Sequence, residues 1–290
     1  MGEIFLGDNL AVMQKFQDGE FQLIYVDPPF NTGRTQERKR IRVTPDLNGD
    51  RTGFQGRRYR SEVVGHSLYD DVFDDYIGFL RPRMEEAHRV LDSNGSLFFH
   101  IDYREVHYCK VMLDEIFGRE SFLNEIIWAY DYGGRPKTRW PAKHDNILWY
   151  AKDPANYTYN YDAIDRIPYM APGLVGKEKA ARGKVPTDVW WHTIVTGKEK
   201  TGYATQKPLD IIRRIVRVHS NPGNRLLDFF AGSGTLGEAA YLEGRDFVLV
   251  DSNPEAVQVM SRRLAQNGLV INEADDVYQM KEIETTPRLL

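Results

Sequence analysis

The tetrapeptide Asp27-Pro28-Pro29-Phe30 follows directly after the apolar run FQLIYV at residues 21–26. Pro29 has no backbone N–H and the two rings restrict the turn, so the Asp27 carboxylate and the Pro28 carbonyl can both accept hydrogen bonds. Phe30 adds a flat apolar face. Two acceptors beside an aromatic ring suit a planar base that carries an amino group. The alternative interpretation, a diproline turn with a capping aspartate and a core phenylalanine, is less favoured because the whole tetrapeptide is present.

A second segment, Asp228 to Thr235, places the small residues AGSG between an expected strand and an expected helix. Small residues let a ligand approach the backbone, and a helix N-terminus offers free N–H groups. Asp251 ends the next expected strand, where a carboxylate in a doubly wound fold can accept hydrogen bonds from both ribose hydroxyls. The alternative is a tight turn at Gly232 and Gly234 with Asp251 as a helix cap. The two features together favour a nucleotide-type site, and the missing third glycine of GxGxxG favours a ligand shorter than a dinucleotide.

These motifs, in this order, resemble those of the bacterial amino-group DNA methyltransferases of the restriction-modification type. A DPPF-like catalytic motif and an FxGxG cofactor motif recur in that family, and the order with DPPF first is similar to that of the beta group. GDN at residues 7–9 and TQKP at residues 205–208 are further matches. The similarity in motif order extends from about Gly7 to about Leu264.

The resemblance implies S-adenosylmethionine as cofactor, double-stranded DNA as partner and a homodimer as a plausible assembly. It assigns catalysis to Asp27, Pro28, Pro29 and Phe30. It places the adenine of the cofactor at Asp8, the ribose at Asp251 and the methionine at Lys207-Pro208, with the glycine segment around methionine and adenosine. Asp8 could instead cap a helix, and Lys207 could be a solvated charge. The implied cofactor-binding residues are Asp8, Lys207, Pro208, Phe230, Ala231, Gly232, Ser233, Gly234, Thr235 and Asp251.

The expected reaction is methylation of an exocyclic amino nitrogen. The target atom lies inside the duplex, so the nucleotide must rotate out of the stack. Asp27 and Pro28 then accept the amino hydrogens and aim the nitrogen at the methyl group, so that catalysis is mainly positioning and electrostatics. An aspartate at the head of the tetrapeptide favours adenine N6 by resemblance. Cytosine N4 is the alternative, and an RNA or a protein amide nitrogen is less favoured.

The elements that must position these residues alternate along the chain. Strands are expected at 3–6 and 21–26 with a helix between them, and helical spacing runs from Tyr76 to Leu91, closed by Asn94-Gly95 before the strand at 96–102. This alternation predicts an α/β fold with a Rossmann-like, doubly wound, mostly parallel sheet and an inserted target-recognition lobe. Further helices are expected at 105–117, 207–220, 234–244 and 253–268, and further strands at 124–130, 144–152, 225–230 and 246–251.

Three parts are predicted. Residues 1–130 form the catalytic half of the methyltransferase domain, 131–206 the target-recognition insertion, and 207–290 the cofactor-binding half. Residues 34–71 are expected to be a mobile loop, because they are polar and lack a period. Nine basic and three acidic residues give the range 34–60 a charge of +6, although the whole chain carries −4. The arginines expected to contact DNA phosphates are Arg34, Arg57, Arg58 and Arg60.

Composition narrows the alternatives. Cys109 is the only cysteine among the 290 residues, so an intramolecular disulfide and a cysteine-based zinc cluster are excluded, and no metal is expected. No apolar run reaches the roughly 18 residues of a membrane helix, so we expect a cytoplasmic protein. The missing third glycine disfavours a nicotinamide-dependent oxidoreductase. The intact Asp27 and FAGSGT segment disfavour a DNA-binding subunit with a vestigial cofactor fold.

Overall fold

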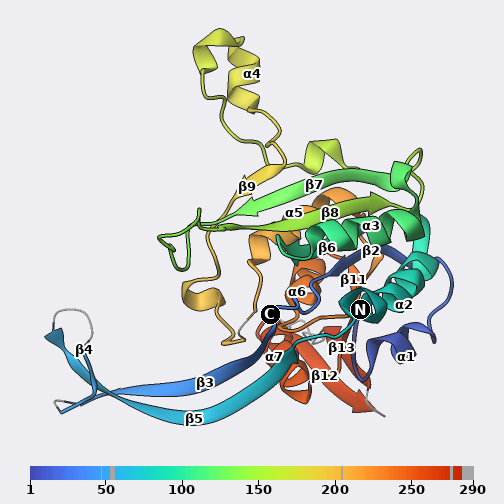
Figure 1. Ribbon diagram of the computed structural model, residues 1–290. Helices are drawn as coiled ribbons and strands as arrows, with labels where there is room; N and C mark the ends of the chain where they lie inside the picture. The colour runs from blue at the N-terminus through green and yellow to red at the C-terminus, as the bar shows by residue number, and fades with distance from the viewer. Residues whose placement is uncertain (47, 53–55, 204, 275–276, 283–290) are drawn as a thin grey trace, which may run out of the picture. The chain divides into compact units, whose positions relative to one another are not determined.

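The computed structural model describes residues 1–46, 48–52, 56–203, 205–274 and 277–282 (Figure 1). The chain divides into two compact units. The larger unit contains residues 1–28 and 77–290, and the smaller contains residues 29–76.

The larger unit is built on a ten-stranded sheet in the order β12-β13-β1-β11-β10-β2-β6-β8-β7-β9. Its five central strands are parallel, because each is followed by a connection that crosses back over the sheet. They are β1 (Gly2–Leu6), β11 (Asp246–Asp251), β10 (Arg225–Asp228), β2 (Phe21–Val26) and β6 (Leu91–Asp102). The predicted α/β fold with a mostly parallel sheet is confirmed.

Antiparallel strands extend both sides of this parallel centre. One side carries β8 (His144–Ala151) and β7 (Phe122–Ala129), followed by β9 (Val189–Trp191), which is parallel to β7. The other side carries β13 (Val277–Glu282) and β12 (Leu269–Ala274), a hairpin that sequence patterning did not predict.

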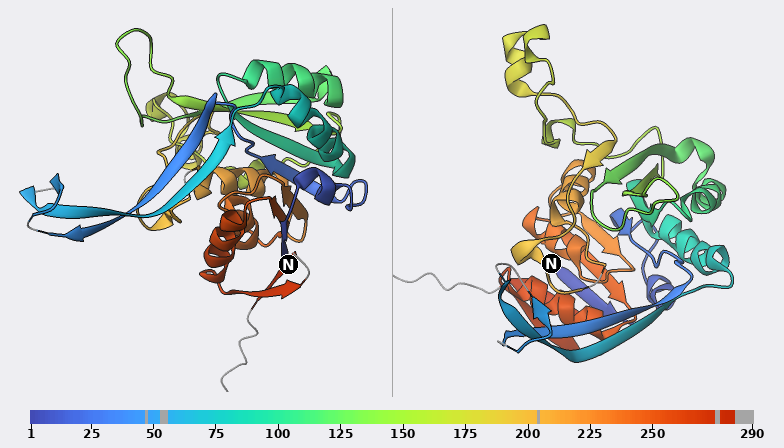
Figure 2. Two further views of the ribbon diagram at one scale, coloured as in Figure 1. Left: turned by 60° about the horizontal axis from the view of Figure 1, so that its bottom comes forward. Right: turned by 60° about the vertical axis from the view of Figure 1, so that its left-hand side comes forward.

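Helices cover both faces of the sheet, as Figures 1 and 2 show. One face is covered by α5 (Leu209–His219), α6 (Thr235–Leu242) and α7 (Pro254–Ala265), whose apolar side chains share one core with Tyr25 of β2 and Phe98 of β6. The other face carries α1 (Asn9–Met13), α2 (Tyr76–Val90) and α3 (Val106–Phe117). The short helix α4 (Lys177–Arg182) buries none of its residues. Single 3-10 turns lie at Arg119–Ser121, Tyr161–Ala163, Pro172–Leu174 and Gly197–Glu199.

The smaller unit differs from the irregular connection predicted for residues 34–71. It contains a three-stranded antiparallel sheet in the order β3-β5-β4, formed by β3 (Arg34–Pro45), β5 (Arg58–Asp71) and β4 (Arg51–Thr52). The prediction failed because it required an apolar period, whereas an antiparallel pair can satisfy its backbone groups in a ladder while both faces stay polar. The expected mobility stays a prediction.

Two boundaries also differ from the prediction. Helix α2 ends at Val90, and Asn94-Gly95 lie inside β6, where the pairing with β2 shifts register. Strand β8, which belongs to the range 131–206, lies between β6 and β7 in the main sheet, and the target-recognition role of this range stays a prediction. Among the described residues, no helix is long and apolar enough to cross a membrane.

Candidate active site and cofactor site

Five carboxylates that the chain separates widely meet at one edge of the main sheet. Parallel strands end at a common edge, so Asp27 after β2, Asp228 at the end of β10 and Asp251 at the end of β11 lie there. Asp8 follows β1, whose register with β11 pairs Leu6 with Asp251. Because β8 runs antiparallel to β6, its first residues reach the same edge, and these include Asp145.

Asp27 forms an ion pair with Lys207, which precedes α5. The Lys207 ammonium donates to Asp27 Oδ2. The Lys207 side chain is 10% exposed and the Asp27 side chain 14%. Asp27 Oδ1 is buried and accepts no hydrogen bond from the described part of the chain. A buried carboxylate oxygen without a donor is costly, and such atoms concentrate where a ligand completes the site.

Pro29 and Phe30 open the smaller unit, where the turn after the diproline is anchored within the unit itself. The Tyr76 hydroxyl donates to the Pro29 carbonyl, and the Phe73 N–H donates to Asn31 Oδ1 at 3.2 Å. Asn31 has a φ of +50°, a conformation that asparagine tolerates better than most residues. This explains the asparagine that follows the tetrapeptide.

The glycine segment forms the turn between β10 and α6. Gly232 and Gly234 have φ values of +50° and +72°, and a Cβ added at Gly234 would lie 2.8 Å from Met260 Cγ. A Cβ added at Gly232 would lie 3.1 Å from the Tyr203 ring. Both glycines are therefore required by backbone conformation and by close neighbours.

Asp251 is tied to the glycine segment by its carboxylate. Oδ2 accepts from the Gly232 N–H and Oδ1 from the Asn253 N–H, each at 2.8 Å. Burial raises the pKa of Asp251, although these two bonds act in the opposite direction. Each oxygen keeps a second lone pair, so the carboxylate can also accept from two ribose hydroxyls. The turn and the carboxylate therefore fit the predicted cofactor, and Asp251 also has the structural role considered as the alternative.

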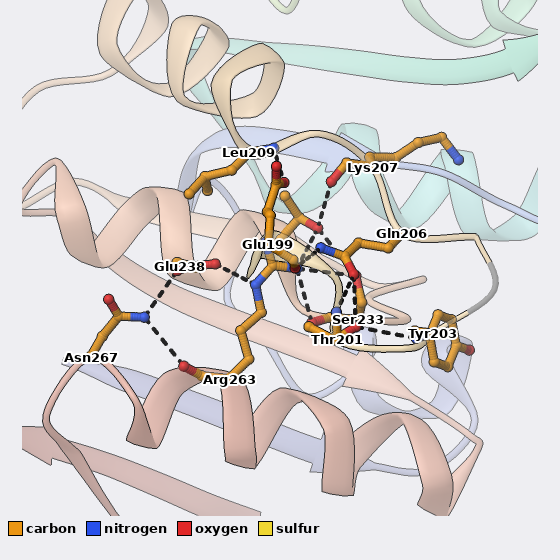
Figure 3. Close-up of polar contacts among 11 residues, drawn as sticks. Glu199, Thr201, Tyr203, Gln206, Lys207, Leu209, Ser233, Glu238, Arg263 and Asn267 are labelled. Atoms are coloured by element: carbon orange, nitrogen blue, oxygen red, sulfur yellow. Dashed lines mark hydrogen bonds and ion pairs between the residues drawn. The ribbon is translucent and has the colours of Figure 1, made fainter. Parts of the chain in front are cut away.

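Arg263 of α7 supports the glycine segment from below, a contact that the sequence did not indicate (Figure 3). Its guanidinium is buried and donates to Ser233 Oγ at 3.2 Å and Thr235 Oγ1 at 2.8 Å, and it forms an ion pair with Glu238. The Thr235 hydroxyl also bonds the Lys207 carbonyl at 3.3 Å. The predicted residues Ser233 and Thr235 thus have partners inside the protein as well as a place beside the cofactor site.

Gln206 and Glu199 organise the segment that precedes α5 (Figure 3). Gln206 Oε1 accepts from the N–H and the hydroxyl of Thr201, both at 2.8 Å, and its amide donates to the Glu199 carbonyl at 2.7 Å. Glu199 Oε1 accepts from the Leu209 N–H at 2.7 Å. These bonds hold the loop that brings Tyr203 against Gly232.

Asp8 takes the helix-capping contact considered as its alternative role. Oδ1 accepts from the Ala11 N–H at 3.0 Å and Oδ2 pairs with Arg83 at 3.0 Å. Arg83 of α2 also donates to Asn9 Oδ1 at 2.6 Å, and Asn9 Nδ2 donates to the Phe229 carbonyl at 2.8 Å. Asn9 and Arg83 thus connect the GDN motif to the glycine segment. Nothing in the helical pattern around Arg83 distinguished it from other surface arginines.

A buried polar network lies beside Asp27 on the α5 face of the sheet. His100 Nδ1 is 2.7 Å from the Tyr25 hydroxyl and its Nε2 is 3.2 Å from Asp145 Oδ2, while the Tyr130 hydroxyl donates to Asp145 Oδ1 at 3.0 Å. Burial raises the pKa of Asp145, but contacts with His100 and the charge of Lys207 outweigh it and lower this pKa overall. Burial, reinforced by the Asp27 charge, raises the pKa of Tyr25. None of these residues was singled out in the sequence.

The arginines predicted to contact DNA belong to the smaller unit. Arg57, Arg58 and Arg60 are exposed in the smaller unit, and Arg60 pairs with Asp46 at 2.9 Å. Arg34 begins β3, and its side chain lies outside the described residues. Among the described residues, no group of three or more His, Cys, Asp or Glu side chains could hold a metal ion. Cys109 is buried, and burial raises the pKa of its thiol to about 12, which disfavours a nucleophilic role.

Known proteins are similar to this chain in sequence. The chain is 29% identical over 276 residues to the DNA adenine methyltransferase YhdJ of Escherichia coli strain K12, which covers 90% of this chain and 82% of that protein. It is 27% identical to the type II methyltransferase M.HpaI of Haemophilus parainfluenzae, over 88% of this chain and 71% of that protein.

Solved structures show the same fold at low identity. The PvuII cytosine-N4-specific DNA methyltransferase matches with a TM-score of 0.62 and 15% identity, over 95% of this chain and 88% of that one. The M1.HpyAVI–SAM complex matches with a TM-score of 0.58 and 21% identity, over 91% of this chain and 99% of that one.

The profile of the DNA methylase family, which groups N6 and N4 methyltransferases, matches residues 21–262. This range contains the Asp27 tetrapeptide, the glycine segment and Asp251. The chain therefore belongs to this family and is an S-adenosylmethionine-dependent DNA methyltransferase that acts on an exocyclic amino group of a base.

Proposed function

We propose that the enzyme methylates the N6 amino group of adenine in double-stranded DNA, with the target nucleotide rotated out of the helix. The aspartate at the head of the tetrapeptide supports adenine, and so does the relative named as an adenine methyltransferase. Rotation of the nucleotide follows from chemistry, since the nitrogen cannot be reached while the base is stacked.

The observation that carries the proposal is Asp27 Oδ1, a buried acceptor with no donor in the described part of the chain. An amino group supplies the missing N–H. The Pro28 carbonyl accepts the second amino hydrogen, and Phe30 lies against the base. Two acceptors in fixed directions turn the nitrogen lone pair out of the ring plane, so the residues act by orientation and electrostatics.

The cofactor is assigned to the glycine segment. Phe230 to Thr235 would line its methionine and adenosine parts, and Asp251 would accept from the ribose hydroxyls. Bound S-adenosylmethionine supplies an electrophilic methyl group on a sulfonium. Asp8 would contact the adenine part of the cofactor, and Pro208 its methionine part.

Cytosine N4 is the second candidate, because Asp27 and Pro28 contact only the amine that the two bases share. Nucleoside analysis separates the two. Unmethylated bacterial genomic DNA is treated with the enzyme and S-adenosylmethionine, digested, and analysed by mass spectrometry. The proposal expects N6-methyladenine, whereas N4-methylcytosine alone would contradict the choice of adenine.

The proposal includes a homodimer, supported by the family resemblance alone. Analytical ultracentrifugation at micromolar concentration measures it. The expected species has twice the 33.5 kDa mass of the chain, and a monomer with full activity would contradict the assembly.

A further inference from the structure

The Lys207 side chain contacts the catalytic carboxylate, whereas its backbone contacts the glycine segment. The ammonium donates to Asp27 Oδ2 and, at 3.5 Å, to the Thr205 carbonyl, and the Lys207 carbonyl accepts from Thr235. Figure 3 shows the side chain directed away from Ser233. The two ends of this one residue therefore reach the two halves of the reaction site.

Charge explains why a lysine is needed there. A buried carboxylate is costly without a cation, and removing one member of a buried pair leaves the other uncompensated. The side chains of Asp27 and Lys207 are 14% and 10% exposed. The groups that face this pair are Asp228 of β10, Tyr25 of β2 and Asp145 of β8, which His100 of β6 contacts, and Asp251 of β11 faces Asp228.

We infer that Lys207 is a positioning residue for Asp27 rather than a ligand of the cofactor's methionine part. Its ammonium occupies Oδ2 and fixes the rotation of the carboxylate. Oδ1 is thereby left as the oxygen of Asp27 that has no donor within the described part of the chain and is ready to accept the amino hydrogen of the base. This inference rests on the proposed role of Asp27.

The division of the two oxygens has a mechanistic consequence. If Oδ2 were unrestrained, the carboxylate could rotate and present either oxygen, and the acceptor direction would be lost. A paired carboxylate holds one acceptor in place before the base arrives, and a preorganised acceptor needs no rearrangement during the reaction.

The test replaces Lys207 with methionine, which keeps the length of the side chain and removes the charge, and with arginine, which keeps the charge. The matched control is Lys152→Met, because Lys152 is a part-buried lysine that bonds the Leu91 carbonyl at the opposite edge of the sheet. Single-turnover methylation of unmethylated genomic DNA and calorimetric binding of S-adenosylmethionine are measured for all variants.

The rate of Lys207→Met is expected to fall by about 10- to 100-fold, the usual effect of losing a group that orients a reacting one. Affinity for S-adenosylmethionine should stay within about twofold, and Lys207→Arg should recover much of the rate. Lys152→Met should keep the wild-type rate.

The pH profile gives a readout that a purely structural role would not move. A buried carboxylate without its cation binds a proton more readily, so the acid limb of the single-turnover rate should move to higher pH in Lys207→Met. It should stay in place in Lys207→Arg and Lys152→Met.

Two outcomes would overturn the inference while leaving the function intact. One is an unchanged single-turnover rate and acid limb in Lys207→Met together with a large loss of cofactor affinity, which would make Lys207 a cofactor ligand. The other concerns the double variant that carries both Lys207→Met and Asp27→Asn. If its loss of rate, expressed as free energy, equals the sum of the losses of the two single variants, Lys207 does not act through Asp27. An active Asp27→Ala variant would instead contradict the proposed function itself.

Discussion

The carboxyl edge of the main sheet and the segment from residue 166 to residue 186 differ in how their side chains are held. At the edge, Asp27, Lys207 and Asp251 are largely buried, Asp27 and Lys207 form an ion pair, and Asp251 accepts from the Gly232 N–H. In the segment, which contains α4, Met170 and Leu174 are 95% and 88% exposed. Figures 1 and 2 show α4 standing away from the sheet near β9.

The difference fits two tasks, and we propose that the exposed segment serves the second of them. Chemistry requires acceptors fixed within a fraction of an ångström, which a strand edge provides. Recognition of DNA needs charged and apolar side chains that remain available to a partner. The segment has five basic residues and one acidic residue, which suits a polyanion, and it lies inside the predicted target-recognition range.

The largest expected effect is that of Asp27→Ala. Without the carboxylate the base has no acceptor at Oδ1, and methyl transfer should fall by on the order of 10³-fold or more. Cofactor affinity should stay nearly unchanged, since the glycine segment is intact. Labelled-methyl transfer and calorimetry measure the two quantities, and near-normal turnover would remove Asp27 from the mechanism.

Asp251→Ala should weaken binding of S-adenosylmethionine by about 1–3 kcal/mol, because two ribose hydroxyls lose a buried acceptor. The variant should also unfold at lower temperature, since the N–H groups of Gly232 and Asn253 lose theirs. Asp246→Ala, at the exposed opposite end of β11, is the control. If calorimetry gave equal cofactor affinities for wild type and Asp251→Ala, Asp251 would have only its capping role.

The arginines of the smaller unit are expected to contact DNA phosphates, and this can be tested without changing the buried residues at the edge of the main sheet. Replacing Arg57, Arg58 and Arg60 with alanine should flatten the slope of log DNA affinity against log salt by about 0.9 for each phosphate that the variant no longer neutralises. Fluorescence anisotropy with labelled duplex DNA measures the slope, and cofactor affinity should stay constant. An unchanged slope would shift attention to the basic residues of the middle region, Arg135, Lys137, Arg139 and Lys143.

The smallest effect on stability is expected for Met170→Ser with Leu174→Ser. Exposed side chains contribute little to the free energy of unfolding, so it should change by less than about 0.5 kcal/mol for each substitution. Cofactor affinity should also be preserved, while affinity for duplex DNA should fall. Wild-type DNA affinity in the double variant would show that this segment does not contact DNA.

Much of the site could be predicted because its residues lie in short motifs at strand ends. DPPF and FAGSGT are recognised by their residue types and spacing. Each follows an apolar run that predicts a buried strand, so both are expected at the edge of the sheet where the strands end. Supporting residues such as Arg83, Arg263 and His100 could not be predicted, because each reaches the site from an element distant in sequence and looks ordinary within its own helix or strand.

The strands of the smaller unit were missed for a different reason. The sequence of these strands has no recognisable apolar period. They are identified in the structure by the backbone pairing of β3 with β5. The contact between Lys207 and Asp27 could not be predicted either, because the TQKP motif indicates that Lys207 belongs to the site but not where its side chain points. The sequence indicated which residues belong to the site, whereas the contacts that each side chain makes became known only from the structure.

A crystal structure of the enzyme with duplex DNA containing its target sequence and an unreactive cofactor analogue would show whether Asp27 Oδ1 holds the amino group of the target base. We expect a rotated adenine whose amino nitrogen lies about 2.7–3.2 Å from Asp27 Oδ1, a normal hydrogen-bond length, with Lys207 still on Oδ2. An amino group directed away from Asp27, or a target base still stacked in the duplex, would contradict it.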